Sequence, residues 1–292
     1  MKNRLQERSL LKSAITNEQM ASSDLLTGVP RTLLIPLRAR AEEHARINAL
    51  FRDPQALDWF QSLLWDAELE TWYDWRYQVC ISVRTKLLDN IAAQHIAVHP
   101  NSLVVELGAG LSSRYYRVGE GKTQWIELDL PQVINVRLSV DRPTSEHRFL
   151  AASVLDRDWM DEIPTIKHEN ILFIAEGLFY YLEESEVRQL VERLRERFGN
   201  AKLALDVGGI VFKQFNANKA ALVGAPMKWF VEDERDVAAL GLSVEKVFPL
   251  LDCYPERWGL VPWIGWWLIF WRSPLRNFCL ILETKLNPVN DL

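Results

Sequence analysis

Short apolar runs alternate with longer amphipathic stretches along the chain, and this alternation begins near residue 100. The runs are too short for helices and are bounded by Gly, Pro or Asn, which suits buried parallel strands. The predicted strands are residues 103–107, 125–129, 149–156 with its exit loop, 170–175, 202–207, 242–248 and 278–285. Strands that alternate with helices predict an α/β protein with a doubly wound, mostly parallel sheet and right-handed crossovers.

The segment before the first strand is helical in pattern. Residues 32–99 contain few glycines, and apolar residues recur at spacings of three and four. The predicted helices with the clearest faces are residues 75–94, 133–140 and 184–198. Residues 1–30 are polar and weakly periodic, which predicts a loose lead-in or short helices. We therefore expect a helical N-terminal cap over residues 1–99 and a Rossmann-like core with inserted segments over residues 100–292.

A glycine turn follows the first predicted strand. Gly108 and Gly110 allow the backbone to bend tightly and to approach a bound molecule, but Ser113 stands where a dinucleotide fingerprint has its third glycine. Glu106 places a carboxylate at the strand end, which suits a cationic ligand better than a pyrophosphate. S-adenosylmethionine, with an ammonium, a sulfonium and no phosphate, fits these features. A plain strand and turn with two incidental glycines is the alternative interpretation.

Three further charged residues lie where the same ligand is expected. Asp129 ends the second strand about 20 residues after the glycines, a position from which a carboxylate binds ribose hydroxyls. Arg84 interrupts the apolar stripe of the helix at 75–94, so it is either a snorkelling or salt-bridged arginine or a fork that binds a carboxylate. Glu176 directly follows the strand at 170–175 and either caps the next segment or faces the ligand.

Five motifs occur in order along the chain. They are TLLIPLRAR at 32–40, VRT at 83–85, ELGAGLSSRYYR at 106–117, ELDLP at 127–131 and AEGLFYYL at 175–182. Together they resemble the leucine carboxyl methyltransferase family, and within it the bacterial small-molecule O-methyltransferases of the tetracenomycin polyketide type. The resemblance covers residues 30 to 207, approximately.

The resemblance implies a class I methyltransferase that uses S-adenosylmethionine and has an antiparallel last strand. It implies that Arg84 binds the carboxylate of the cofactor's methionine part and that Glu176 lies on the cofactor side. Loops after the third strand touch the adenine in this fold, which makes Ser153 and Val154 candidates, although the family often has an acidic residue where Ser153 stands. The predicted cofactor site comprises Arg84, Glu106, Gly108, Gly110, Asp129, Ser153, Val154 and Glu176.

The implied reaction is O-methylation of a small molecule, at a carboxylate or a phenolic hydroxyl, by direct displacement. This chemistry requires little acid or base catalysis, and no histidine lies in a triad or metal spacing, so we name no catalytic base and expect no metal. Tyr180 and Tyr181 are candidate acceptor-binding residues, and the segment 114–116 either reaches the reacting end or packs. The open alternatives are a carboxyl methyltransferase of a protein C-terminus, an NAD(P)-binding oxidoreductase and a non-catalytic cofactor-binding partner protein.

Composition narrows the possible partners. A net charge of -5 and the absence of long Lys or Arg runs argue against nucleic acid. The three cysteines have no metal-site spacing, which indicates reduced thiols in a cytoplasmic protein. The N-terminus leads into no apolar signal region, and the longest apolar run, 260–271, is too short to span a bilayer.

Residues 258–271 hold five of the twelve tryptophans. Pro262 suits the first position of a helix on which Trp263 and Trp267 share a face. A helix that is apolar all round must be buried by the core and acceptor pocket, by a partner subunit or by a membrane surface, and the segment lacks the basic face that a membrane surface favours. We predict that this segment walls a hydrophobic acceptor pocket with Trp263 and Trp267, and a homo-oligomer contact through it is a second possibility.

Overall fold

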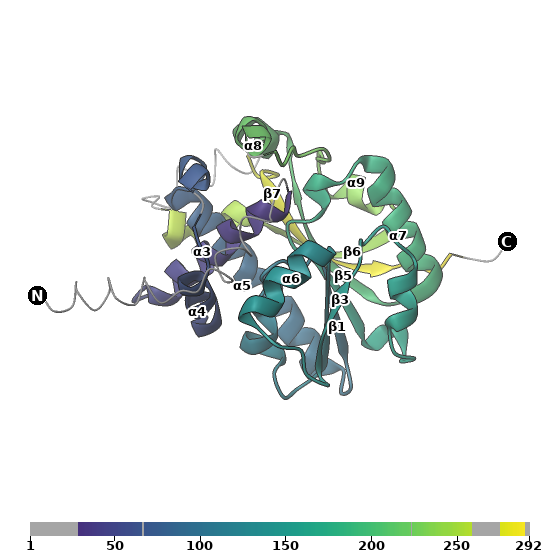
Figure 1. Cartoon of the computed structure of the whole chain (residues 1–292). Coiled ribbons are helices and arrows are strands. Elements are labelled where there is room, and N and C mark those ends of the chain that lie inside the picture. The colour runs from purple at the N-terminus through teal and green to yellow at the C-terminus, as the bar shows by residue number, and fades with distance from the viewer. Residues whose placement is uncertain (1–28, 66, 223, 259–274, 290–292) are drawn as a thin grey trace, which may run out of the picture.

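The structure is a computed structural model that describes residues 29–289 with the exception of 66, 223 and 259–274. In these residues, seven strands form one sheet in the order β3-β2-β1-β4-β5-β7-β6. They are β1 Leu103–Leu107, β2 Gln124–Asp129, β3 His147–Ala151, β4 Ile171–Ala175, β5 Lys202–Gly208, β6 Leu242–Pro249 and β7 Cys279–Leu286. The first five strands run parallel, and β7 is antiparallel to both β5 and β6 (Figure 1). This confirms the predicted fold class, including the antiparallel last strand.

The helices predicted at 75–94, 133–140 and 184–198 correspond to α5 Trp75–Val98, α6 Pro131–Val140 and α7 Glu184–Phe198. α3 Leu34–Ala45 and α4 Pro54–Ser62 lie in the segment with a helical pattern, whereas no helix is predicted at α8 Ile210–Leu222 or α9 Glu234–Ala238. Short helical turns cover Val29–Leu33, Ala67–Thr71, Tyr115–Gly119, Asp158–Glu162, His168–Asn170, Phe179–Tyr181, Leu250–Asp252 and Pro255–Trp258. No helix in the described part of the chain is long and apolar enough to cross a lipid bilayer.

Helices cover both faces of the sheet (Figure 1). On one face, Val83 and Leu88 of α5 pack in a cluster with Val104 of β1. On the other face, Leu190 of α7 packs in a cluster with Val105 of the same strand. Because adjacent strand residues point to opposite faces, a strand covered on both sides carries apolar residues at successive positions. This explains why the predicted strands appear in the sequence as continuous apolar runs.

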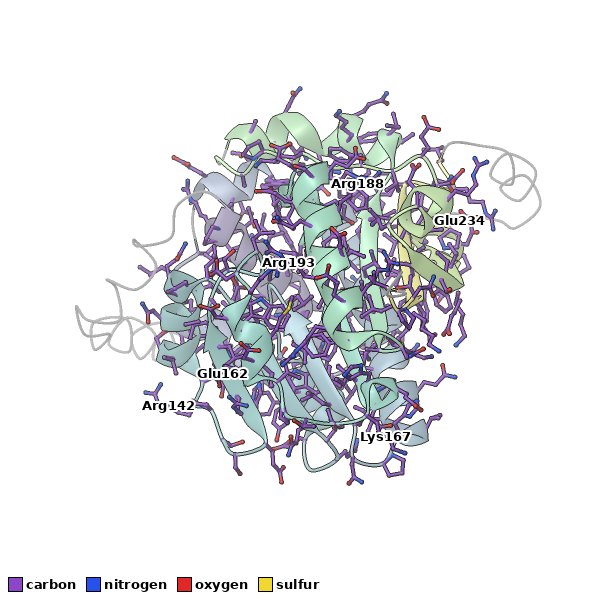
Figure 2. The ribbon with its side chains drawn as sticks, turned by 90° about the vertical axis from the view of Figure 1, so that its right-hand side faces the viewer. Arg142, Glu162, Lys167, Arg188, Arg193 and Glu234 are labelled. Carbon is purple, nitrogen blue, oxygen red and sulfur yellow. The ribbon has the colours of Figure 1, made fainter. Side chains whose placement is uncertain are left out.

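α7 is the amphipathic helix that the sequence predicts over 184–198. Glu183 and Glu186 form a capping box at its start, and Gly199 follows its end. Its buried side consists of Val187, Leu190, Val191, Leu194 and Phe198. Figure 2 looks onto the side of the molecule that carries α7, where the labelled Arg188 has a side chain that is 51% exposed. Burial of each apolar side chain contributes roughly 1.5–3 kcal/mol, so this face anchors α7 to the sheet.

The N-terminal helices pack together on the other side of the molecule. Leu37 of α3 lies in one cluster with Ala56 and Trp59 of α4, and α3 also contacts α5. The lead-in predicted for residues 1–30 lies almost entirely outside the described residues. The division into a cap over 1–99 and a core over 100–292 stays a prediction, and α5, which belongs to the predicted cap, packs directly on the sheet.

Candidate functional site

A cavity of about 870 Å³ lies at the carboxyl ends of the parallel strands, a size typical of small-molecule sites. The strand order reverses between β1 and β4, and ligands of open α/β sheets bind at such a switch point. All predicted site residues that the structure describes line this cavity: Arg84, Glu106, Gly108, Gly110, Asp129, Ser153, Val154, Glu176, Tyr180 and Tyr181. We call the part around the glycine turn, lined by 106–111, Asp129, 152–154 and Glu176, the glycine-turn end.

The glycine turn adopts a backbone that only glycine accepts easily. Gly108 and Gly110 have φ angles of +65° and +55°. A Cβ on Gly108 would lie 2.9 Å from Leu178 Cδ1, inside van der Waals contact. The turn is fastened to β2 because the N–H of Gly108 donates to the carbonyl of Leu128 over 2.8 Å. A side chain at Gly108 would therefore distort the wall of the cavity.

Asp129 fixes the same turn from the end of β2. Its Oδ2 accepts from the Gly110 N–H at 2.6 Å, and its Oδ1 accepts from the Leu130 N–H at 2.7 Å. Burial raises the pKa of Asp129 to about 6, although both hydrogen bonds oppose this rise. The glycine turn is therefore held by a carboxylate whose hydrogen bond to the Gly110 N–H depends on its protonation state.

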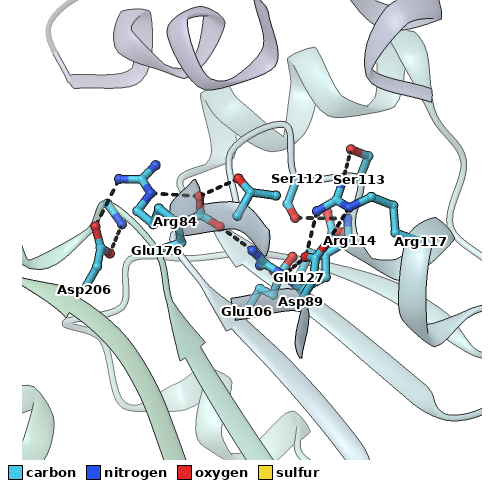
Figure 3. Close-up of polar contacts among 12 residues, drawn as sticks. Arg84, Asp89, Glu106, Ser112, Ser113, Arg114, Arg117, Glu127, Glu176 and Asp206 are labelled. Carbon is cyan, nitrogen blue, oxygen red and sulfur yellow. Dashed lines mark hydrogen bonds and ion pairs between the residues drawn. The ribbon is translucent and has the colours of Figure 1, made fainter. Parts of the chain in front are cut away.

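Arg84 binds two carboxylates near the carboxyl ends of the neighbouring strands β4 and β5 (Figure 3). Its Nε donates to Glu176 Oε1 at 2.9 Å, and its Nη1 donates to Asp206 Oδ2 at 3.0 Å. Burial would raise the pKa of Glu176, but Arg84 and Arg114 hold it well below its usual value. Of the two interpretations of Arg84 from the sequence, the structure contains the buried salt bridge, while Nη2 makes no hydrogen bond to a described residue.

Arg114 is the centre of a second cluster of charges (Figure 3). It is buried, and it donates to Glu106, to Glu176 and, over 2.8 Å, to Asp89. Glu106 Oε2 is buried and has no hydrogen-bond partner among the described residues. Burial raises the pKa of Glu106, against the attraction of Arg114.

The two clusters belong to one buried network of alternating charges. Its carboxylates are Asp53, Asp89, Glu106, Glu176 and Asp206, and its guanidinium groups are Arg40, Arg84, Arg114 and Arg117. With every member ionised, five carboxylates against four guanidinium groups give the network one negative charge in excess beside the glycine-turn end. Such a site favours a cationic ligand over an anionic one.

Sequence reasoning missed several carboxylates of this network. Asp206 lies near the end of β5, so the pattern that identified Asp129, an acid after an apolar run, could have found it. Asp89 and Asp53 carry no comparable signal, because their partners are distant in the sequence. Of the segment 114–116, Arg114 lines the cavity, whereas Tyr115 stacks on His147 with ring centroids 4.0 Å apart and belongs to the packing behind it.

Tyr180 lines the cavity as a hydrogen-bond donor. Its hydroxyl donates to Asp206 Oδ2 over 2.7 Å, and its ring stacks on Phe212 of α8. Burial, followed by the charge of Asp206, raises the pKa of Tyr180 well above its usual value. Tyr180 therefore stays neutral and does not act as a general base. The neighbouring Tyr181 donates to the hydroxyl of Thr32 at 3.4 Å.

The cavity continues from the glycine-turn end between α5 and α8. We call this part the aromatic end; it is lined by Trp72, Trp75, Tyr77, Phe212, Phe215, Asn216, Lys219 and Met227. Most of these residues follow β5 in the chain. Within the described ranges, no group of His, Cys, Asp and Glu side chains is arranged to hold a metal ion.

The tryptophan-rich segment is described only at its first residue. Trp258 lines the cavity, and its Nε1 donates to the carbonyl of Cys253 at 2.9 Å. The predicted helix with Trp263, Trp266, Trp267 and Trp271 lies outside the described residues. Contacts of Trp263 and Trp267 with an acceptor, and a subunit contact through this segment, therefore stay predictions.

The motifs around the cavity have a counterpart in a known family. A profile of the leucine carboxyl methyltransferase family matches residues 36–195, which is more than half of the chain. The chain belongs to this family. The matched residues run from α3 to α7 and include every predicted cofactor residue.

Three relatives of this protein are named as methyltransferases. The tetracenomycin polyketide synthesis O-methyltransferase TcmP of Streptomyces glaucescens is 29% identical over 241 residues, covering 80% of this chain and 87% of that protein. A Streptomyces avermitilis protein provisionally named an S-adenosyl-L-methionine-dependent methyltransferase is 32% identical over 225 residues, covering 70% and 78%. The S-adenosyl-L-methionine-dependent methyltransferase dpfgK of Gibberella zeae is 26% identical over 275 residues, covering 84% and 89%.

Solved structures share the fold at low sequence identity. A crystal structure from Thermobifida fusca has a TM-score of 0.56 and 12% identity, over 85% of this chain and 94% of that one. A DUF574 family protein from Streptomyces avermitilis has a TM-score of 0.52 and 13% identity, over 86% and 97%. These likenesses confirm the predicted fold, and the family profile and the named relatives confirm the predicted family and its cofactor, S-adenosyl-L-methionine.

Proposed function

We propose that this protein transfers the methyl group of S-adenosylmethionine to an oxygen atom of a small molecule. The observation that carries the proposal is that the glycine-turn end and the aromatic end belong to one continuous cavity. One end then has the charges that suit the cofactor, and the other has the apolar walls that suit an organic acceptor. The similarity to TcmP, whose name describes an O-methyltransferase of polyketide synthesis, supports oxygen as the acceptor atom.

The residues of the glycine-turn end suit S-adenosylmethionine in charge. Glu106 Oε2, buried and unpaired among the described residues, suits the ammonium group. Asp129 suits the ribose hydroxyls, and Arg84 Nη2 is left to bind the carboxylate by a single contact rather than as a fork. Ser153 and Val154 are assigned to the adenine. Gly108 keeps the approach to this end free, since a Cβ there would meet Leu178.

The chain contributes orientation and a dry cavity to this reaction. When bound, the cofactor would supply an electrophilic methyl carbon: the acceptor oxygen bonds to this carbon while its bond to sulfur breaks, and S-adenosylhomocysteine is the leaving group. Tyr180 stays protonated, so we assign it the role of a donor that holds Asp206 and Arg84 in place. A carboxylate or phenolate acceptor is already nucleophilic, so methyl transfer to it does not require Tyr180 to act as a base.

Incubation with methyl-labelled S-adenosylmethionine and a panel of polyketide phenols and aromatic carboxylic acids tests the proposal. Label should appear on oxygen in at least one compound class, as assigned by mass spectrometry and NMR of the product. Label on nitrogen or carbon alone, or on protein alone, would contradict the proposal, and the latter result would favour the alternative of a protein C-terminal carboxyl methyltransferase. Binding of cofactor without any transfer would favour a non-catalytic partner protein.

A further inference from the structure

One face of α8 forms a wall of the aromatic end. Phe212, Phe215, Asn216 and Lys219 are spaced by three and four residues, so they share a side of the helix, and all four line the cavity. Opposite them, Trp72 and Tyr77 pack edge to face with ring centroids 6.1 Å apart. The two walls line a mainly aromatic part of the cavity, which we call the slot. A flat aromatic molecule stacks well in such a slot.

The two walls are tied together by polar contacts near Lys219. The hydroxyl of Tyr77 donates to Asn216 Oδ1, and the amide of Asn216 donates to the Phe212 carbonyl at 2.8 Å. Lys219 Nζ lies 4.9 Å from the centre of the Tyr77 ring and 3.4 Å from the Trp72 carbonyl. The ammonium group is thus held at the slot by one long hydrogen bond and a cation–π contact.

Lys219 differs from the other cations that line the cavity. Arg40, Arg76, Arg84 and Arg114 each pair with at least one carboxylate. No carboxylate of the described residues lies within 4 Å of Lys219 Nζ, so its charge is not neutralised by the protein there. An ammonium group that has no carboxylate partner among the described residues and lies beside aromatic rings is suited to bind an anionic oxygen of a ligand.

We propose that Lys219 is a specificity-determining residue that binds an anionic oxygen, carboxylate or phenolate, of a flat aromatic acceptor. The inference rests on the proposed function only in that it treats the aromatic end as the acceptor end. It commits the substrate to one class, an aromatic anion, and separates the protein from methyltransferases that act on neutral alcohols or on amines. Lys219 binds the charged oxygen of the acceptor, while Trp72, Tyr77 and Phe212 pack against its flat aromatic ring.

Equilibrium binding of two isosteric probes tests this assignment. The probes are 2-naphthoate and the neutral 2-naphthamide, titrated calorimetrically into the full chain saturated with S-adenosylhomocysteine. In the wild type, 2-naphthoate should bind about tenfold more tightly than the amide, the preference that one charge-assisted hydrogen bond provides. Lys219→Met should abolish this preference and Lys219→Arg should retain it. Equal affinities in the wild type, no binding of 2-naphthoate, or an unchanged preference in Lys219→Met would each overturn the proposal.

Lys213→Met is the matched control on the same helix. Lys213 is exposed, lies 5.3 Å from the ring centre of Phe230 and does not line the cavity, so its replacement should leave both affinities unchanged. The affinity for S-adenosylhomocysteine, measured first for each variant, shows that the variant is folded. If the wild type does not bind S-adenosylhomocysteine, the proposed function fails. If it does bind and naphthoate is not preferred, only the role of Lys219 fails.

Discussion

Asp129 is the residue whose protonation should be visible in cofactor binding. Its pKa of about 6 means that the carboxyl group is ionised above this pH and protonated below it. Ribose hydroxyls donate to the ionised form, so binding favours ionisation, and the affinity for S-adenosylhomocysteine should fall as the pH decreases through about 6. Calorimetric titration from pH 5 to pH 8 measures this. A flat profile in the wild type would contradict the role of Asp129.

The variant Asp129→Ala separates this effect from other titrating groups. We expect it to weaken cofactor binding by roughly 1–3 kcal/mol at pH 7.5, because the ribose and the Gly110 N–H both lose their acceptor. We also expect the step near pH 6 to disappear. Unaltered affinity in this variant would remove Asp129 from the cofactor site.

Gly108 tests the shape of the same end. Gly108→Val should lower the affinity for S-adenosylhomocysteine at least tenfold, because a Cβ there lies 2.9 Å from Leu178 Cδ1 and the cavity wall must shift. Gly121→Val is the control, since Gly121 has the same φ of +65° but no atom within 4 Å of an added Cβ. Gly121→Val therefore introduces the same backbone strain of about 1–2 kcal/mol but no steric clash like that with Leu178. Equal affinities in the two variants would exclude a steric effect.

At the scale of elements, α6 supports the loop that follows the glycine turn. Arg137 of α6 is buried, donates to the Ser112 carbonyl, and contacts Glu127 at 3.0 Å and Asp141 at 2.9 Å. Arg137→Met leaves two buried carboxylates short of a partner, so the free energy of unfolding should fall by about 3–5 kcal/mol. Urea denaturation measures this loss.

Arg188→Met is the control for Arg137. Arg188 forms a half-exposed pair with Glu184 on α7, and its loss should cost about 0.5 kcal/mol. If both variants unfold at the same urea concentration, the buried ion pairs of Arg137 contribute no more than a surface pair. The affinity of Arg137→Met for S-adenosylhomocysteine further shows whether α6 positions the loop or only stabilises the fold.

The elements themselves could be predicted from the sequence because their signals are local. The strand at Leu103–Leu107 and the helix at Glu184–Phe198 are each specified by apolar spacing and by a Gly or Pro at the boundary. Of the strand and exit loop predicted over 149–156, the strand occupies His147–Ala151, and the exit loop contains a turn in which Ser153 Oγ accepts from the Leu155 N–H. The ion network could not be predicted, since Arg84 and Asp206 are 122 residues apart.

In the candidate site, too, local signals could be predicted from the sequence and pairings between distant residues could not. Residues next to strand ends, such as Glu106, Asp129 and Glu176, could be selected because the fold brings strand ends together. The partners that use up two nitrogens of Arg84 could not be inferred, since side-chain pairing depends on packing rather than on spacing. Lys219 could not be selected from the sequence for a similar reason. Its proposed role depends on having no carboxylate nearby among the described residues, and this becomes visible only in three dimensions.

At the scale of the whole molecule, the N-terminal helices and the glycine loop are fastened together. Arg40 of α3 donates to the Leu111 carbonyl at 2.5 Å, and Ser113 donates to Asp53, which precedes α4, at 2.6 Å. α5 covers one face of the sheet with apolar residues. A fragment of residues 100–292 should therefore fail to fold, with dispersed amide NMR signals absent. A fragment that folds and binds S-adenosylhomocysteine would instead support an independent core starting at residue 100.

The position of α8 in the chain has a consequence for the diversification of these enzymes. It lies in the connection between β5 and β6, after the last parallel crossover, so its inner face can change while the strand ends of the glycine-turn end keep their residues. Under the proposed function, exchange of residues 210–222 between relatives is a compact route to altered acceptor preference, both in evolution and in enzyme engineering.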